Sequence, residues 1–291
     1  MTCALTVSFD CQAVDFDRRA GHPEGVASRI AAAVAELAPA GEGVVLDLGA
    51  GTGQIGRHLA QMSRAGTSRP GMSGAGMSGA RGAFRYLGVD ISGPMLAVFR
   101  RKLDTGARGV LVRADAGGRW PIASGTVDLV FISRAAHLLP PEVLVEEALR
   151  VARPEGALLV LGGVRSPPES LRVVLRREMR RLLAEQGFEG RSASEGQRRI
   201  ALALAERGGE VLPVRTAASW SVVHRAGDVL AAWRAKPGLG GRAVRPEIQD
   251  KVLRRLEYWI RERYGGLEVA RQATERYELA AVRLPKRPEV H

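Results

Sequence analysis

The sequence predicts an α/β fold with a doubly wound, mainly parallel sheet and an inserted helical segment. Short apolar stretches alternate with helix-like stretches between residues 43 and 164, as they do in chains of β-α units. The first apolar stretch ends in a glycine-rich turn at residues 49–53. Ligands of doubly wound sheets bind at such strand ends, so this turn is the first candidate site.

The first half of the chain supports this fold element by element. A helix over residues 22–37 begins with Pro23, which suits a first turn, and repeats apolar residues on one face. Ser92 and Pro94 begin a later helix as its cap and first turn. The other expected elements are strands over 43–48, 84–90, 109–115, 126–133 and 156–164, and helices over 52–62 and 140–153.

The second half is mostly helical. Helices are expected over about 168–187, 192–207, 226–235 and 245–264, with strand character in 211–224 and a closing strand at 277–284. We therefore expect a ligand-binding core over 1–164, a mostly helical cap over 165–276, and a closing strand and tail over 277–291. A Gly/Ser-rich segment at 63–82, with the near-repeat GMSGAGMSGA, is expected to be a flexible insertion in the core.

Composition limits the classes of partner. No run approaches the roughly 20 apolar residues of a membrane span, and the first residues lack an export signal, so a cytoplasmic protein is expected. Cys3 and Cys11, without a nearby histidine, do not form a zinc site, and no metal is expected. The net charge of +12 makes nucleic acid an alternative partner. However, arginines alternate with glutamates in LRREMRRLLAEQ, and aromatic residues are only 5% of the chain, which favours a solvated surface.

Three glycines, Gly49, Gly51 and Gly53, follow the first strand. Glycine permits the positive φ angles and the close backbone approach that a ligand-cradling turn requires. The stretch also contains Gly51-x-Gly53-x-x-Gly56, the bare dinucleotide fingerprint. Asp47 disfavours that alternative, because a carboxylate beside the turn would repel a pyrophosphate. A cationic or zwitterionic ligand would tolerate it.

Asp47, Asp90 and Asp115 each end one of three successive strands. Such positions converge on one crevice of a doubly wound sheet. Each acid alone is also explained as a turn or helix-capping residue, but together with the glycine turn they indicate one site.

The motifs VVLDLGAGTG, YLGVD and VRADA, with EEALRVARPEGALLV, resemble those of class I S-adenosylmethionine-dependent methyltransferases over residues 15–163. The similarity is to the type 11 and ubiquinone-biosynthesis-like enzymes that methylate small molecules. It implies a Rossmann-like core, S-adenosylmethionine as cofactor, and in-line methyl transfer to a small-molecule acceptor. The alternative is a nucleic-acid-binding protein, or an RNA or DNA methyltransferase, on the same fold, with arginines 172–181 as its contact segment.

The resemblance also assigns roles. Asp90 would accept hydrogen bonds from the ribose hydroxyls and Asp115 from the adenine amino group, while Ala116 would present its amide to the ring, and Ile91 and Met95 would cover it. The insertion at 63–82 explains why Asp90 lies farther from the turn than the family pattern expects. The full set implied to bind the cofactor is Asp47, Gly49, Ala50, Gly51, Gly53, Asp90, Ile91, Met95, Asp115, Ala116 and Ser133.

The sequence departs from the family pattern at two points, one that concerns the cofactor and one that concerns the acceptor. Many relatives have Tyr-Asp near the first helix, whereas this chain has Phe16-Asp17 and lacks that phenol. It also lacks the Asn/Asp-Pro-Pro-aromatic and Pro-Cys elements of base-modifying relatives, which disfavours nucleic acid as acceptor. His137 is the candidate general base or acceptor hydrogen-bond partner; the alternative is a structural residue at a helix start.

Overall fold

The sheet of the computed structural model is the feature that positions the site. Along the sheet the strands are β3 (Gly109–Arg113), β2 (Arg85–Asp90), β1 (Val44–Leu48), β4 (Leu129–Ser133), β5 (Leu158–Arg165), β8 (Ala270–Arg283) and β6 (Glu210–Val211). Strands β1 to β5 pair in parallel, with Val45 opposite both Tyr86 and Leu129. The chain winds outward from β1 through β2 to β3, then returns to β4 on the other side of β1. The doubly wound, mainly parallel sheet is therefore confirmed, and β1 and β4 flank its switch point.

The structure describes residues 10–11, 13–39, 43–65, 84–104, 107, 109–188, 193–236, 238–241 and 243–286. The predicted insertion at 63–82 falls mostly outside these residues, as does Cys3. The described chain divides into two compact units. The first contains residues 1–163, 196–218 and 277–291, and the second contains 164–195 and 219–276.

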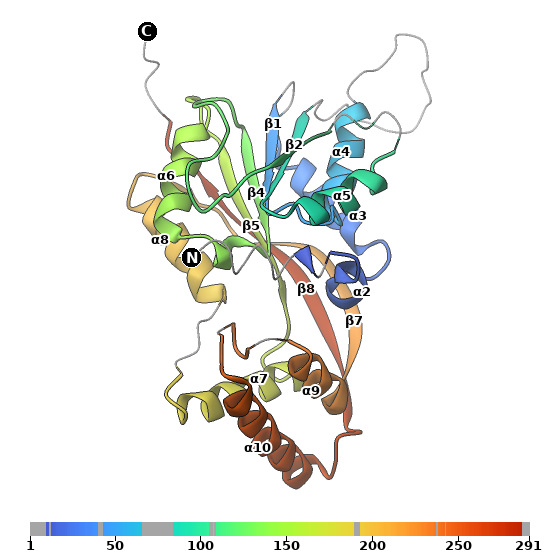
Figure 1. The fold of residues 1–291 in the computed structure, drawn as a ribbon. Helices are drawn as coiled ribbons and strands as arrows, with labels where there is room; N and C mark the ends of the chain where they lie inside the picture. Colours follow the sequence, from blue (N-terminus) through green and yellow to red (C-terminus); the bar gives the residue numbers. More distant parts are fainter. Residues whose placement is uncertain are drawn as a thin grey trace. The chain divides into compact units, whose positions relative to one another are not determined.

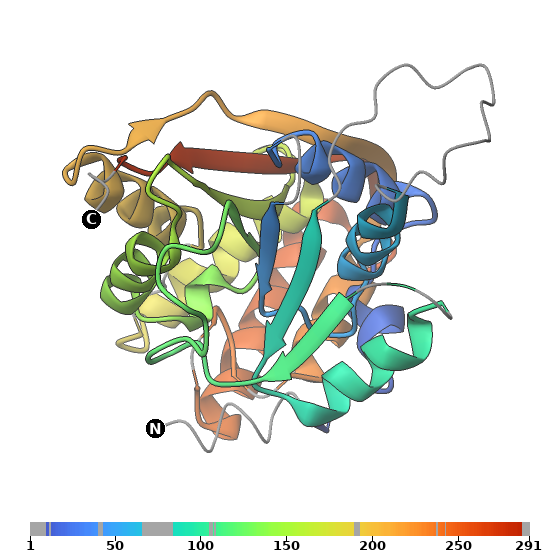
Figure 2. The same cartoon turned by 90° about the horizontal axis from the view of Figure 1, so that it is seen from above.

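Helices cover both faces of the sheet in the first unit (Figures 1 and 2). On one face, α6 (Pro141–Val151) and α8 (Ala193–Ala205) bury Leu144, Ala148, Ile200 and Leu204 in a core shared with β1, β4 and β5. The other side carries α3 (Val26–Ala35), α4 (Gly56–Ala65) and α5 (Gly93–Lys102). As the sequence predicts, Ser92 caps α5, accepting a 3.3 Å hydrogen bond from the amide of Met95.

Two predicted boundaries differ from the structure. Helix α4 begins at Gly56 instead of 52, because the glycine-rich turn continues to residue 55. Strand β8 begins at Ala270 instead of 277, and it pairs antiparallel with β6 and also with β7 (Arg215–Arg225). The residues that β8 adds are mostly polar and exposed, so apolar pattern alone does not mark them as strand.

The second unit has its own core. Helices α7 (Leu171–Ala184), α9 (Ala226–Arg234) and α10 (Pro246–Tyr264) bury one apolar stripe each, including Leu175, Leu230 and Leu256. We expected one cap over 165–276, but residues 196–218 belong to the first unit because α8 buries Ile200 and Leu204 in the sheet core. The enclosing role of the cap stays a prediction.

In the part of the chain that the structure describes, no helix is long and apolar enough to cross a membrane.

Candidate functional site

A cavity of about 410 Å³ lies in the first unit at the carboxyl ends of the parallel strands. It brings together ten of the twelve predicted site residues: Asp47, Gly49, Ala50, Gly51, Asp90, Ile91, Met95, Asp115, Ala116 and Ser133. Sequence reasoning did not place Thr52, Gln54, Ile55, Ala135, Leu138, Leu139 and Pro140 at this cavity. The volume falls in the range of small-molecule sites, roughly 300–1,000 Å³.

Gly53 and His137 are the two predicted residues that do not line the cavity. A Cβ at Gly53 would overlap the ring of Phe99, so this glycine allows the turn to pack against α5. His137 lies in a short 3-10 helix, Ala136–Leu138, with an exposed side chain. No histidine is among the described residues that line the cavity.

The glycine-rich turn is fixed by β2. The amides of Gly49 and Ala50 donate to the carbonyl of Val89 at 2.8 and 3.1 Å. Gly49 has a φ of 72°, and a Cβ there would lie 2.5 Å from the Cβ of Ala135. Only glycine combines that backbone conformation with so close an approach.

Asp47 is the most buried acid at the cavity, with 2% of its surface exposed. The hydroxyl of Tyr86 donates to Oδ2 at 2.7 Å, whereas Oδ1 has no hydrogen-bond partner among the described residues. Burial raises the pKa of Asp47 to about 7; the Tyr86 hydrogen bond lowers it, and the nearby Asp90 raises it. A buried carboxylate oxygen without a donor is costly, so this one is suited to a cationic ligand group.

Asp90 faces the same cavity from the end of β2. Its Oδ2 accepts from the amide of Gly51 and its Oδ1 from the amide of Ser92, both at 2.8 Å. Burial raises the pKa of Asp90, and these two amides oppose that rise. Each oxygen has a second lone pair, so the fixed carboxylate can still accept hydrogen bonds from a ligand.

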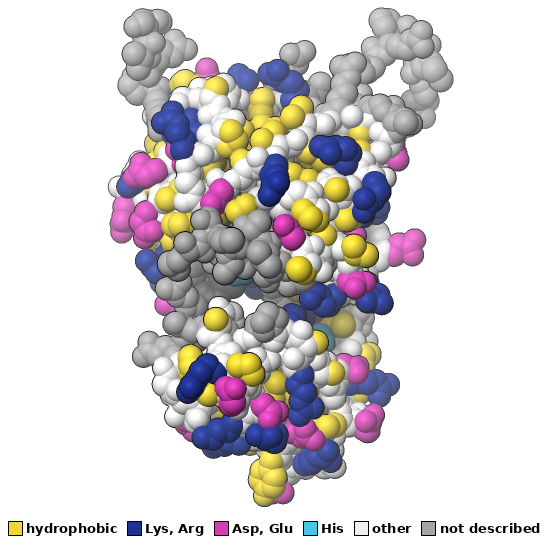
Figure 3. Space-filling view, in the orientation of Figure 1, with side chains coloured by type: hydrophobic (Ala, Val, Ile, Leu, Met, Phe, Trp, Pro, Cys, Tyr) yellow, Lys and Arg dark blue, Asp and Glu magenta, His cyan; other side chains and the backbone are white. Residues whose placement is uncertain are grey.

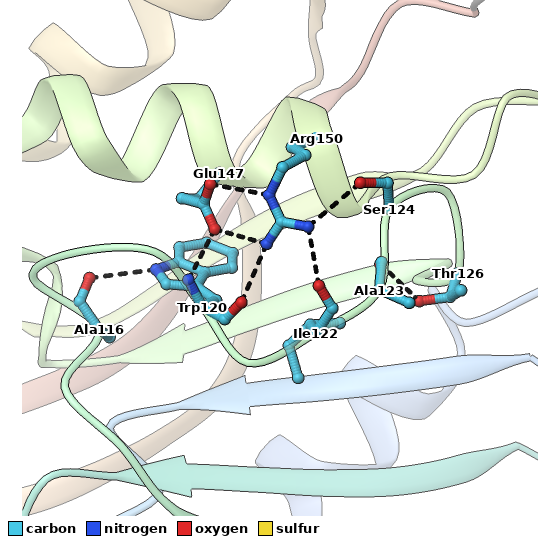
Figure 4. Close-up of polar contacts among 8 residues, drawn as sticks. All are labelled: Ala116, Trp120, Ile122, Ala123, Ser124, Thr126, Glu147 and Arg150. Carbon is cyan, nitrogen blue, oxygen red and sulfur yellow. Dashed lines mark hydrogen bonds and ion pairs between the residues drawn. The ribbon is translucent and has the colours of Figure 1, made fainter.

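Asp115 and Ala116 lie on the loop that follows β3, and a polar network holds that loop (Figure 4). Glu147 of α6 accepts from the amide of Trp120 at 2.7 Å, and Arg150 donates to the carbonyls of Trp120 and Ile122. Arg150 also binds both oxygens of Glu147, at 2.8 and 2.6 Å. The indole of Trp120 donates to the carbonyl of Ala116 at 3.1 Å, so α6 positions the loop that lines the cavity.

Phe16 reaches the cavity because α2 (Phe16–Ala20) is tied to the glycine-rich turn. Asp17 accepts hydrogen bonds from Thr52, Gln54 and Lys102. Burial would raise the pKa of Asp17, but these hydrogen bonds and the charge of Lys102 lower it below its usual value. The phenol that many relatives carry at this position is replaced by the apolar ring of Phe16.

The end of β4 carries a hydroxyl and a guanidinium. Ser133 Oγ lies 2.6 Å from the hydroxyl of Tyr277, whose ring packs edge-on against His22 at 5.4 Å. Burial, with the charge of Arg134, lowers the pKa of His22 to about 4, so His22 is neutral at physiological pH. Arg134 has a φ of 57°, rare for a residue with a side chain, and its guanidinium donates to the carbonyl of Ala20 at 2.7 Å.

These residues line a candidate ligand site in a doubly wound α/β protein, and the oxygen of Asp47 without a partner among the described residues suits a positively charged group. Carboxylates from the ends of β1 and β2 and from the loop after β3 surround a glycine-rich turn. No group of three or more His, Cys, Asp or Glu within the described ranges could hold a metal ion.

Comparison with known proteins gives one partial family match. The model of the family described as a methyltransferase domain matches residues 70–160, which include Asp90 and Asp115 but not the glycine-rich turn. The matched segment is less than half of the chain, and over this segment the chain is similar to that family. A search of curated proteins finds no significant match.

Solved structures share the fold at low sequence identity. A candidate methyltransferase from Bacillus halodurans C-125 is 18% identical, with 88% of this chain and 98% of that chain covered and a TM-score of 0.53. The cyclase SpnF is 17% identical, with 97% and 95% covered and a TM-score of 0.51.

Proposed function

We propose that this protein is a class I S-adenosylmethionine-dependent methyltransferase that holds its cofactor in the cavity of the first unit and transfers the methyl group to a small-molecule acceptor. The observation that carries the proposal is the cavity at the strand ends, with Asp47, Asp90 and Asp115 on its wall. When bound, S-adenosylmethionine supplies a methyl group on a positively charged sulfur, already a strong electrophile. The task of the protein is then to bind, orient and exclude water.

The residues present fit this cofactor. Oδ1 of Asp47, buried and without a partner among the described residues, suits the α-ammonium group. Asp90 offers two fixed acceptor oxygens to the ribose hydroxyls. In Asp115, Oδ1 accepts from the amide of Gly117 at 2.7 Å, which leaves Oδ2 to the adenine amino group. Ile91 and Met95 add apolar surface beside them.

The acceptor would lie against lining residues that the cofactor does not use. Phe16, Leu138 and Leu139 supply apolar surface there, and Ser133 and Arg134 supply a hydroxyl and a guanidinium. Tyr277 orients the hydroxyl of Ser133. This set suits a small molecule of mixed polarity, and methyl transfer needs no general base where the acceptor atom carries no proton that must leave.

Nucleic acid is the less favoured acceptor. The arginines that suggested it are in part neutralised, since Arg181 pairs with Glu178 and Glu185. On the face shown in Figure 3, acidic and basic side chains are interspersed over both units, whereas a nucleic-acid surface gathers positive charge on one face.

Calorimetry with S-adenosylhomocysteine tests the cofactor site. We expect the full chain to bind it and Asp90→Ala to weaken binding by about 1–3 kcal/mol, the value of a hydrogen bond to a charged group. Asp104→Ala is the matched control, because it removes the same charge at an exposed position outside the cavity. No binding by folded wild-type protein would contradict the proposal.

A further inference from the structure

Helix α2 and the chain around it have little apolar packing of their own. No residue from 14 to 25 is buried, whereas Ala13 before this stretch and Val26 after it are buried. Within the stretch α2 covers only Phe16–Ala20, and the side chain of its N-cap residue, Asp15, makes no capping hydrogen bond. A helix this short is not stable by itself, so bonds to neighbouring segments must hold it in place.

Asp17 ties α2 to the glycine-rich turn. Its Oδ1 accepts from the hydroxyl of Thr52 and, at 2.7 Å, from the side-chain amide of Gln54, while Lys102 at the end of α5 donates to Oδ2. The same ammonium group also donates to the carbonyl of Thr52 at 2.9 Å. Helix α2, the turn and the end of α5 therefore meet at one carboxylate, and we call this group of residues the Asp17 latch.

The other end of α2 is tied across the switch point of the sheet. The carbonyl of Ala20 accepts from the guanidinium of Arg134 at 2.7 Å, and the backbone amide of His22 donates to Gln54 at 3.3 Å. The glycine-rich turn follows β1 and Arg134 follows β4, so these bonds connect α2 to the ends of both strands that flank the switch point. Phe16 lines the cavity from α2. The stretch 14–25 is thus held beside the cavity by polar bonds rather than by buried apolar side chains.

We propose that Asp17 is a positioning residue, because the Asp17 latch holds residues 14–25 as a strap beside the cavity and its release lets ligands enter and leave. Segments with few buried apolar contacts open locally, without unfolding of the core, and such movements often set the rate of ligand exchange. The identity of the ligand as S-adenosylmethionine rests on the proposed function, whereas the latch itself does not.

The latch joins protein groups to one another and not to a ligand. Asp17 is not among the described residues that line the cavity. Loss of its hydrogen bonds should therefore weaken the closed strap by the same amount with and without a ligand. Association and dissociation should then both become faster, while the affinity changes little. A residue placed in contact with the cofactor, such as Asp90, should instead change the affinity.

Hydrogen exchange of the ligand-free protein tests the strap. In wild type, the amides of residues 18–22 should exchange faster than those of α6, which packs in the sheet core, because the strap opens without the core. Asp17→Asn should speed exchange at 18–22 about 10-fold or more, since an amide cannot pair with Lys102 as a carboxylate does. Exchange at 18–22 as slow as in α6 would overturn the proposal.

Asp15→Asn is the matched control for Asp17→Asn. It removes the same charge two residues away, where Asp15 is exposed and pairs with the exposed Arg18 at 2.9 Å. Exchange at 18–22 should stay close to that of wild type in this variant. Equal effects of Asp15→Asn and Asp17→Asn would show that the charge of the segment matters and the latch does not, and would overturn the proposal.

Rapid-mixing kinetics with S-adenosylhomocysteine test the effect on ligand exchange. Asp17→Asn should raise the association and the dissociation rate constants by a similar factor, about 10-fold or more, and leave the dissociation constant little changed. Phe16→Ala keeps the latch but removes the ring that lines the cavity, so it should raise both rate constants without faster exchange at 18–22.

The outcomes separate this inference from the proposed function. Wild-type rate constants in Asp17→Asn, or faster dissociation with unchanged association, would overturn the strap, and the second result would assign Asp17 to the support of a ligand contact. Wild-type protein that shows the expected exchange pattern but binds no S-adenosylhomocysteine would support the latch and contradict the proposed cofactor.

Discussion

The buried charges around α6 and those at the cavity differ in how completely they are satisfied. Glu147 and Arg150 bind each other, and their remaining polar atoms bind the backbone around Trp120 and Ile122. Asp47 is more deeply buried, yet one of its oxygens lacks a partner among the described residues. The first arrangement completes a fold, whereas the second is incomplete until a ligand supplies a positive group.

The same contrast recurs within the second unit, with the opposite sign. Arg181 is exposed and paired, whereas Arg176 is half-buried and has no ion-pair partner among the described residues. At Asp47, the buried charge without a partner marks a candidate site for a cationic ligand group. Buried charges that are paired, as in Glu147 and Arg150, instead hold the fold together.

The largest loss of stability is expected when the buried pair of Glu147 and Arg150 is broken. Glu147→Ala leaves Arg150 without its carboxylate and the amide of Trp120 without its acceptor. We expect a loss of about 2–4 kcal/mol in the free energy of unfolding, measured by urea denaturation. Glu146→Ala is the control: Glu146 is exposed and pairs with Arg207, so the loss should stay below about 1 kcal/mol. Equal losses in the two variants would remove the distinction between paired buried charge and surface charge.

Asp47→Asn should have a smaller effect. It should raise the stability of the fold near neutral pH but weaken ligand binding. Because the pKa of Asp47 is raised from 3.8 to about 7, the folded state binds a proton that the unfolded state has released. Wild-type stability therefore falls as the pH rises from about 4 to 7, and Asp47→Asn should remove this loss. Thermal melting at several pH values measures this fall in stability. A variant less stable than wild type near neutral pH would contradict the raised pKa of Asp47.

The same variant should weaken binding of S-adenosylhomocysteine by about 1–3 kcal/mol, since an amide cannot pair with an ammonium group as a carboxylate does. Wild-type affinity should rise between about pH 6 and 8 as Asp47 loses its proton. Asp47→Asn should not show this rise. An unchanged pH profile in the variant would exclude Asp47 as the titrating group.

The smallest effect is expected at the end of β4. Tyr277→Phe removes the partner of Ser133 Oγ but keeps the ring against His22. We expect methyl transfer to slow by about 10-fold or less, with cofactor binding unchanged in calorimetry. Weaker cofactor binding in the variant would assign the Ser133–Tyr277 pair to the cofactor rather than to the acceptor.

The sequence predicted the parts of the site that are local in the chain. Asp47 and Asp90 lie at the ends of apolar strands and Asp115 just beyond one, and parallel topology then places all three at one edge. Partners from distant segments could not be predicted this way. Tyr86 reaches Asp47 from the neighbouring strand, and Tyr277 reaches Ser133 from 144 residues away. No spacing rule connects such residues.

The arginines of α7 show a second limit. In the sequence, residues 172–181 have glutamates nearby, and all their arginines look alike. Only the packing of α7 separates Arg176, beside the core stripe, from the exposed Arg177 and the paired Arg181. His137 illustrates the converse, because its position after β4 suggested catalysis while its side chain is exposed and outside the cavity lining.

The central claim is tested most directly by methyl transfer from isotope-labelled S-adenosylmethionine, with products detected by mass. The panel would contain small organic molecules of mixed polarity, and RNA and DNA. We predict a labelled small-molecule product that wild type forms and Asp90→Ala forms far more slowly. Labelled nucleic acid without any labelled small molecule would contradict the account.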